Sequence, residues 1–298
     1  MLAEARTSSA DPGAGSAFFA GIGQVELTYD GHTGRLPLFF SAGSSLTALF
    51  PARLGVLRKL LGHPQLRAAR VAPGVGLLAV MAVEYRASDV GVYDEVLVGI
   101  PLHPGGGPNV GATLALEAAR GRIPVHVLRM PVTSERALAT GRRFWNFPKF
   151  LAEIELSGTG GERVCTLAEA SRPILTLRGP ALAPQRSRLI RYQASTFMDG
   201  QPQSCEFRVH AKRMGLRAGR GVARVELGDA HPMTRELDAA LLTRQALAWS
   251  VVADFEAILF GPERPTPAYL AQLAQGLGSV HLPELPARAP ISEGGALA

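Results

Sequence analysis

Lys149 is the residue whose setting most clearly predicts chemistry. It lies in residues 141–156, GRRFWNFPKFLAEIEL, the most aromatic stretch of a chain with only 6% aromatic residues. Only three of the 31 basic residues are lysine, namely Lys59, Lys149 and Lys212. Burial among apolar side chains disfavours an ammonium ion. A neutral amine can attack a carbonyl carbon to form an imine, which guanidinium cannot do. The alternative is that the stem packs on the aromatic rings while the amine reaches water.

Other catalytic signatures are missing from the sequence. The seven histidines show no metal-binding helical spacing, and neither HExxH nor GxSxG occurs. Gly105 opens a glycine-rich stretch that continues into no phosphate-binding motif. Cys165 and Cys205 are too few for a disulfide framework or a four-cysteine zinc site. We therefore expect neither a metal nor a cofactor.

Composition predicts a globular protein that meets neither membranes nor nucleic acid. The 298 residues are 47% apolar, yet the longest apolar run, residues 75–83, is far shorter than the roughly 20 residues of a membrane span. Glu4 and Asp11 interrupt an N-terminus without an apolar signal region, so we expect a cytoplasmic location. The net charge is +6, but the basic residues are scattered rather than clustered with aromatics.

The apolar patterns predict mostly strands with a few helices. Strands are expected at 24–29, 36–41, 77–85, 95–102, 123–130, 151–156, 172–178, 188–197, 205–211 and 221–227. Helical spacing predicts helices at 45–61, 134–144 and 234–259, and Asp199-Gly200 is typical of a hairpin turn. This order favours an α+β domain on an antiparallel sheet. We expect one domain, residues 21–281, between a flexible N-terminal segment, 1–20, and a flexible tail, 282–298.

The segment around Lys149 resembles the signature of the acetoacetate decarboxylase superfamily. In that signature Gly-Arg-Glu, a few residues and then aromatic-Pro-Lys lead into a strand, and the family's Schiff-base lysine falls on Lys149. Residues 88–101, SDVGVYDEVLVGIP, resemble a second family segment, which places Tyr93 on its tyrosine and Glu95 on an active-site glutamate. Residues 222–262 resemble the family's closing strand and helix. The resemblance spans most of residues 24–262 and implies a barrel-like core and a homo-oligomer.

Of four departures from the family pattern, three concern the handling of a substrate carboxylate. Phe150 stands where the family has a second lysine, and Val80 falls where it has a second carboxylate. The arginine that grips the substrate has no clear counterpart, with His32 as plausible as Arg35. Residues 103–121 resemble an insertion relative to the shorter pattern of the family. The part that generates the amine is thus kept, and the part that binds the carboxylate is altered.

We therefore expect a Schiff-base-forming lyase that acts through Lys149 on a small oxo acid, in an aldol, dehydration or cyclisation reaction of secondary metabolism. Glu95 is expected to move protons at the imine. The residues expected to contact the substrate are Tyr93, Arg142, Trp145 and Phe147. Two alternatives stay open: a decarboxylase of a 3-oxo acid, and a non-catalytic barrel that binds a small hydrophobic ligand and in which Lys149 merely packs.

Overall fold

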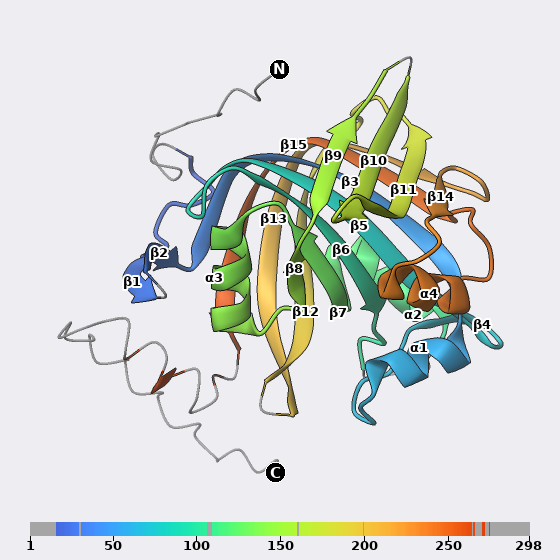
Figure 1. The fold of residues 1–298 in the computed structure, drawn as a ribbon, viewed down its shortest axis with the longest axis horizontal. Coiled ribbons are helices and arrows are strands. Elements are labelled where there is room, and N and C mark those ends of the chain that lie inside the picture. The colour runs from blue at the N-terminus through green and yellow to red at the C-terminus, as the bar shows by residue number, and fades with distance from the viewer. Residues whose placement is uncertain are drawn as a thin grey trace, which may run out of the picture.

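The computed structural model describes residues 16–263 except 30, 106–108, 160 and 199, and in addition residues 265, 270, 271 and 274. Most of the expected N-terminal segment, the whole of the expected C-terminal tail and Asp199 of the expected hairpin turn lie outside the described residues. Within the described part the chain forms fifteen strands and four helices (Figure 1).

Seven long strands form a closed barrel. Their bounds are β3 (Leu38–Arg53), β5 (Val75–Ser88), β6 (Tyr93–Pro101), β7 (Arg122–Val132), β12 (Arg186–Met198), β13 (Gln201–Ala218) and β15 (Ala248–Pro262). They are hydrogen-bonded in the order β12-β13-β15-β3-β5-β6-β7, and parallel pairing of β7 with β12 closes the ring. The other neighbours in the ring are antiparallel. The prediction of an α+β fold with an antiparallel, barrel-like core is therefore confirmed.

A second layer covers the outside of β3, β5 and β6. It is a four-stranded sheet of β14 (Arg224–Leu227), β11 (Arg172–Pro180), β10 (Glu162–Glu169) and β9 (Glu153–Ser157), accompanied by α1 (Leu54–Leu61) and α4 (Pro232–Ala240). Phe50, Val98 and Ile174 lie in the hydrophobic core between the layers and are fully buried. Strand β10 was not predicted, because charged residues flank its short apolar centre.

Two of the predicted helices were wrong over much of their length. Residues 45–53 belong to β3 and residues 248–259 to β15. Each strand is covered on one face by the second layer, at Phe50 of β3 and Trp249 of β15. Its other face lines the barrel interior, where β15 is buried at Val252 and β3 is half-buried at Leu49. A strand that is apolar on both faces also has apolar residues at helical spacing, so the periodicity could not separate the two. Only the stretches that became α1 and α4 are helical.

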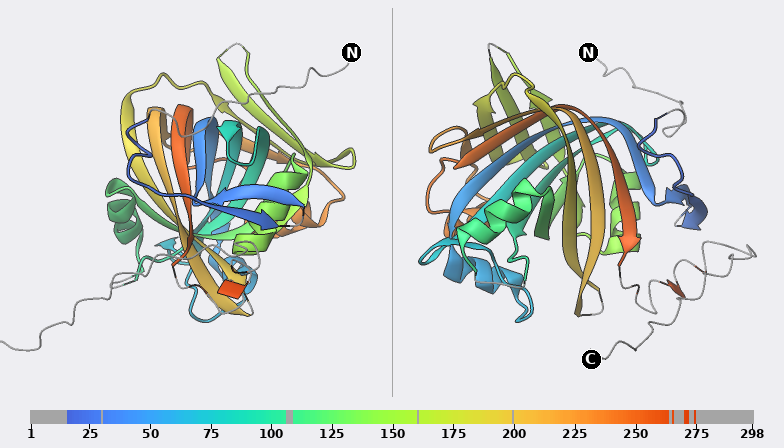
Figure 2. Two further views of the ribbon diagram at one scale, coloured as in Figure 1. Left: turned by 90° about the vertical axis from the view of Figure 1, so that its left-hand side faces the viewer. Right: turned by 180° about the vertical axis from the view of Figure 1, so that it is seen from behind.

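The two ends of the barrel are covered by different elements. Helix α3 (Glu135–Trp145) follows β7 and lies beside the paired strands β1 (Val25–Tyr29) and β2 (His32–Leu36), whereas α2 (Gly111–Ala119) precedes β7 and lies at its opposite end (Figures 1 and 2). Tyr29 Oη and Thr140 Oγ1 are hydrogen-bonded at 2.6 Å, which ties β1 to α3. The short strand β4 (Arg70–Ala72) pairs with the start of β5.

The predicted helix at 134–144 is confirmed as α3. Ser134 caps it by accepting a hydrogen bond from the Ala137 amide at 3.3 Å.

None of the helices in the described part of the chain is long and apolar enough to cross a membrane.

Candidate active site

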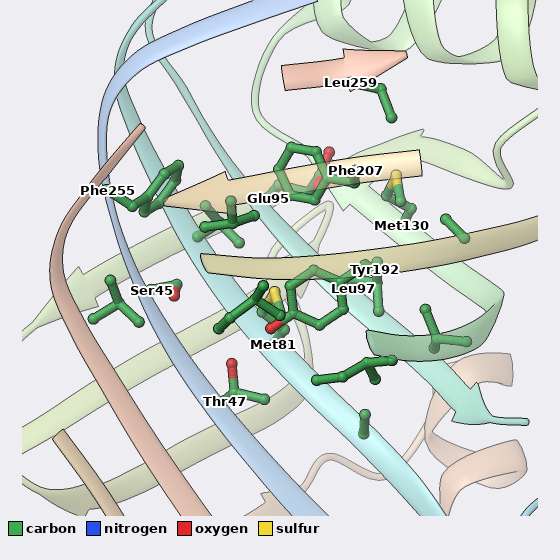
Figure 3. A pocket seen from close by; sticks show the side chains of 18 of the residues that line it. Ser45, Thr47, Met81, Glu95, Leu97, Met130, Tyr192, Phe207, Phe255 and Leu259 are labelled. Atoms are coloured by element: carbon green, nitrogen blue, oxygen red, sulfur yellow. The ribbon is translucent and has the colours of Figure 1, made fainter. Parts of the chain in front are cut away.

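The barrel encloses a cavity of about 330 Å³. Side chains from all seven barrel strands line it, and Figure 3 shows Met81, Leu97, Tyr192 and Phe207 directed into this space. The lining is mostly apolar. Among the described residues that line the cavity, the charged ones are Glu95, Lys149 and Arg188. The volume lies in the range of pockets that enclose whole small-molecule ligands.

Lys149 and Glu95 form a buried pair at the α3 end of the cavity. Lys149 is the first residue of β8 (Lys149–Leu151), which pairs in parallel with β7 at Met130. Glu95 lies on β6, opposite Val132 of β7. Strand β7 therefore lies between the two strands that carry these side chains. Lys149 Nζ donates to Glu95 Oε2 at 2.6 Å. Their side chains are 5% and 7% exposed, so bulk water screens the pair little.

Two tyrosines complete the polar surroundings of this pair. Tyr93 and Tyr85 are opposite each other in the β5–β6 register, and their ring centroids are 4.6 Å apart. Tyr85 Oη donates to Glu95 Oε1 at 3.5 Å, and Lys149 Nζ lies 5.6 Å from the centre of the Tyr93 ring. Burial, with the charge of Glu95, raises the pKa of Tyr85 and of Tyr93 well above 10. Both hydroxyls therefore stay protonated near neutral pH and can act as donors.

The end of α3 sets the position of Lys149. Asn146 ends the helix in the left-handed conformation, with φ of 50°, which turns the chain back toward the barrel. Arg142 then donates from Nε and Nη2 to the Lys149 carbonyl oxygen at 2.9 and 2.5 Å. The Lys149 stem passes directly over Gly141, where an added Cβ would lie 2.6 Å from Lys149 Cδ and closer still to Cε. A glycine inside a helix costs about 1 kcal/mol relative to alanine, and here it provides the space for this side chain.

The structure places Trp145 and Phe147 in the lining beside Lys149, with their rings nearly parallel and 5.9 Å apart. Trp145 Nε1 donates to the Phe260 carbonyl at 2.9 Å, which fixes the indole. Arg142 does not line the cavity, and its side chain is occupied by the main chain of Lys149. Its side chain holds the main chain at Lys149, and this position does not support the substrate contact that we expected.

The single residues that depart from the family pattern all point away from the cavity or lie outside it. Val80 points away from the cavity into the core between the layers. Phe150 also points away and lies against the His231 ring, 5.9 Å between centroids. Arg35 and His32 are on β2 and do not line the cavity. The described residues at the Lys149 end therefore include no arginine that faces the cavity.

Two thiols and one buried imidazole that could act as nucleophile or base lie outside this cavity. Burial raises the pKa of the Cys165 and Cys205 thiols to about 12, and it lowers the pKa of His126 to about 4. None of the three lines the cavity. The described residues contain no group of three or more His, Cys, Asp or Glu side chains that could hold a metal ion.

The residue that the sequence analysis missed is Tyr85. Its strand was predicted, at 77–85, but no motif marked the tyrosine itself. The signal is the register of β5 and β6, which puts Tyr85 opposite Tyr93 and on the face that carries Glu95. A strand prediction alone does not supply this register.

Comparisons with known proteins agree with this architecture. A solved acetoacetate decarboxylase superimposes with a TM-score of 0.52 at 19% identity, covering 76% of this chain and 88% of that one. The acetoacetate decarboxylase of Legionella pneumophila gives 0.52 at 15% identity, with 76% and 86% covered. The enduracididine biosynthesis enzyme MppR, solved with pyruvate, gives 0.50 at 13% identity, with 76% and 88% covered. These identities show the fold alone. Comparison with curated proteins gives no match. The family model for acetoacetate decarboxylase matches residues 31–255, three quarters of the chain, and the chain therefore belongs to the acetoacetate decarboxylase family.

Proposed function

We propose that this protein is a lyase that forms a Schiff base between Lys149 and an oxo acid. The observation that carries the proposal is the amine itself: Lys149 Nζ faces a largely apolar cavity and lies 2.6 Å from a carboxylate that can take its proton. Family membership supports a lysine-dependent enzyme of oxo acids. MppR, which shares the fold, was solved with pyruvate, a 2-oxo acid.

Glu95 accelerates the attack by accepting a proton from Lys149. Transfer across the 2.6 Å hydrogen bond leaves an amine and a carboxylic acid, both neutral. Where water is largely excluded, this neutral arrangement avoids the cost of two buried charges. The amine nitrogen then bonds to the carbonyl carbon, and a proton moves from nitrogen to oxygen to give the carbinolamine. Glu95 returns its proton to the hydroxyl, water leaves, and an iminium ion remains beside the Glu95 carboxylate.

The iminium ion then serves as the electron sink. When a bond at the adjacent carbon breaks, its electron pair moves into the C–C bond and the nitrogen becomes neutral, giving an enamine. Glu95 is placed to take a proton from this carbon and later to return one, the usual work of a general base. Tyr85, which donates to the other Glu95 oxygen, stabilises the ionised carboxylate. Water finally adds to the imine and releases Lys149.

The test is borohydride trapping with a panel of 2-oxo and 3-oxo acids. Hydride reduction of the imine fixes the substrate on the amine, so the Lys149 peptide gains the mass of the substrate less one oxygen atom. Lys149→Arg keeps the positive charge but removes the nucleophile, and both labelling and turnover should disappear. The matched control is Lys212→Arg, because Lys212 pairs with Glu256 at 2.8 Å outside the cavity. Labelling of Lys212 or Lys59 with Lys149 unmodified would contradict the proposal.

Product analysis then separates the two reactions that share this imine. Carbon dioxide released from a 3-oxo acid would identify a decarboxylase. A condensed or dehydrated product would identify an aldol-type lyase.

A further inference from the structure

The cavity continues far beyond the Lys149–Glu95 pair. Along β6 its lining includes Glu95, Leu97 and Pro101. The six steps from Glu95 to Pro101 span about 20 Å at ~3.3 Å per residue. A strand tilt of 35–45° reduces this to about 15 Å along the barrel axis. The lining therefore extends through most of the barrel, whereas the carbonyl of a substrate needs only the end at Lys149.

The opposite end of the cavity is formed by α2. Leu114 and Ala118 of this helix belong to the lining, together with Ile123 at the start of β7. Helix α3, which lies over Lys149, follows the other end of the same strand. The Arg188 guanidinium donates to the carbonyl oxygens of Ala118 and Ala119, the latter at 2.8 Å, and holds the end of α2 against β12. The insertion suggested by the sequence, 103–121, thus contributes the far wall.

Small residues keep this far end open. Ala79, Ala118 and Ala248 line it. In the register, Ala79 and Ala248 are both paired with Leu49, so two methyl groups flank one larger side chain at this level. A barrel of this size can be filled by its own side chains or can hold one ligand. Alanines at these positions favour a ligand.

The polarity of the lining defines what this ligand can be. Between the pair at one end and Arg188 at the other, the lining is aliphatic or aromatic apart from a few hydroxyls, such as those of Ser45 and Thr47. A compact oxo acid of three or four carbons would contact only the Lys149 end and leave the remaining apolar wall without a partner.

We propose that the substrate is an oxo acid with an extended apolar chain, whose oxo carbon meets Lys149 and whose chain runs along β6 toward α2. This inference rests on the proposed imine chemistry. It adds the class of substrate: a medium- or long-chain compound instead of a small one. Each methylene placed in the lumen leaves water and gains contact with the lining.

The test is a series of straight-chain 2-oxo acids, from three carbons upward, trapped with borohydride at concentrations well below saturation. Trapping at Lys149 should rise about fourfold for each added methylene, because burial of one methylene contributes ~0.8 kcal/mol. It should fall again once the chain exceeds the cavity. Efficiency that is independent of length, or highest for the three-carbon acid, overturns the inference.

Two variants locate the chain. Ala79→Leu narrows the lumen, and Ala118→Leu does so from α2 without altering a barrel strand. Each should lower the ratio of long-chain to short-chain trapping about fifteenfold, roughly the loss of two buried methylenes. Ala239→Leu, at an exposed position on α4, is the matched control. An unchanged ratio in both cavity variants contradicts the inference.

Binding of saturated fatty acids separates a failure of this inference from a failure of the proposed chemistry. These probes lack the oxo group, so they cannot form an imine. Calorimetric titration of the unmodified protein should give affinity that increases with chain length. Fatty-acid binding without any trapping would refute the imine chemistry and keep the chain site. Trapping of short acids without fatty-acid binding would refute the chain site and keep the imine chemistry.

Discussion

Replacement of Glu95 by glutamine tests the centre of the mechanism. Glutamine keeps the shape of the side chain 2.6 Å from Lys149 Nζ but cannot accept the proton of the ammonium. Loss of a general acid–base group typically lowers turnover by 10²–10⁴-fold. The change also breaks a buried ion pair. With side chains only 5% and 7% exposed, the full cost of such a break, about 3–5 kcal/mol of unfolding free energy, is the upper bound.

The assay compares turnover, proton exchange at the substrate α-carbon in deuterated water, and borohydride trapping in the same preparation. We expect turnover and exchange to fall by 10²–10⁴-fold, whereas trapping at Lys149 becomes slower but still occurs, since the amine is present and can lose its proton to water. The matched control is Glu256→Gln, which removes a buried carboxylate paired with Lys212 at 2.8 Å outside the cavity. This control should lose some stability and keep turnover.

Two results would refute the reasoning. Unchanged turnover in Glu95→Gln means that another group moves the proton. Complete loss of trapping in a variant with an intact circular dichroism spectrum means that Glu95 acts on Lys149, as its partner or its proton acceptor, and refutes a proton shuttle that works only at the substrate. Urea unfolding measures the unfolding free energy of the variant, and it therefore separates both results from a loss of fold.

Three further changes address the surroundings of the pair. Gly141→Ala adds a Cβ 2.6 Å from Lys149 Cδ and should displace the lysine side chain, although alanine favours the helix. Trapping at Lys149 should therefore slow more than tenfold. An unchanged trapping rate contradicts the packing argument. Tyr85→Phe removes a long hydrogen bond to Glu95 and should lower kcat about tenfold, the effect of ~1.5 kcal/mol, with KM nearly constant; a change in KM alone would place Tyr85 in binding instead. Burial lowers the pKa of His126 to about 4, below its ordinary 6.5, so the unfolded chain binds the proton more tightly. The unfolding free energy should therefore fall by about 2 kcal/mol from pH 7.5 to pH 5. In His126→Gln, urea unfolding should show a pH dependence that is smaller by this amount. An equal pH dependence of the unfolding free energy in both proteins contradicts the prediction.

The sequence marked the two charged residues that meet in the cavity, whereas it assigned some of the elements around them wrongly. Lys149 was marked by an aromatic surrounding and a family motif, and Glu95 by a second motif. The structure brings these two residues into contact although 54 positions separate them. Local patterns predicted α3 and most strands, because alternation and a serine cap are properties of neighbouring residues. They failed at β3 and β15, whose second buried face exists only after another sheet has packed on them.

The cavity could not be predicted, since its size depends on which residues meet across strands. Ala79 is an ordinary small residue in the sequence. It leaves space only because the register sets it beside Leu49 of β3, with α2 closing the end of the barrel. For the same reason Arg142, which stands in the motif, was expected at the substrate, while its side chain in fact holds the Lys149 carbonyl.

The double-sided strands also explain how one fold can serve different substrates. On β3, Phe50 packs in the core between the sheets, whereas Ser45 and Thr47, on the opposite face, line the cavity and belong to none of the hydrophobic clusters. On β3 the large buried contacts that hold the layers together are therefore separate from the side chains that line the cavity. Substitution at the second set changes the cavity with little loss of core packing. Lys149, held by β7 and by Gly141 of α3, keeps its position when the far end of the lumen changes.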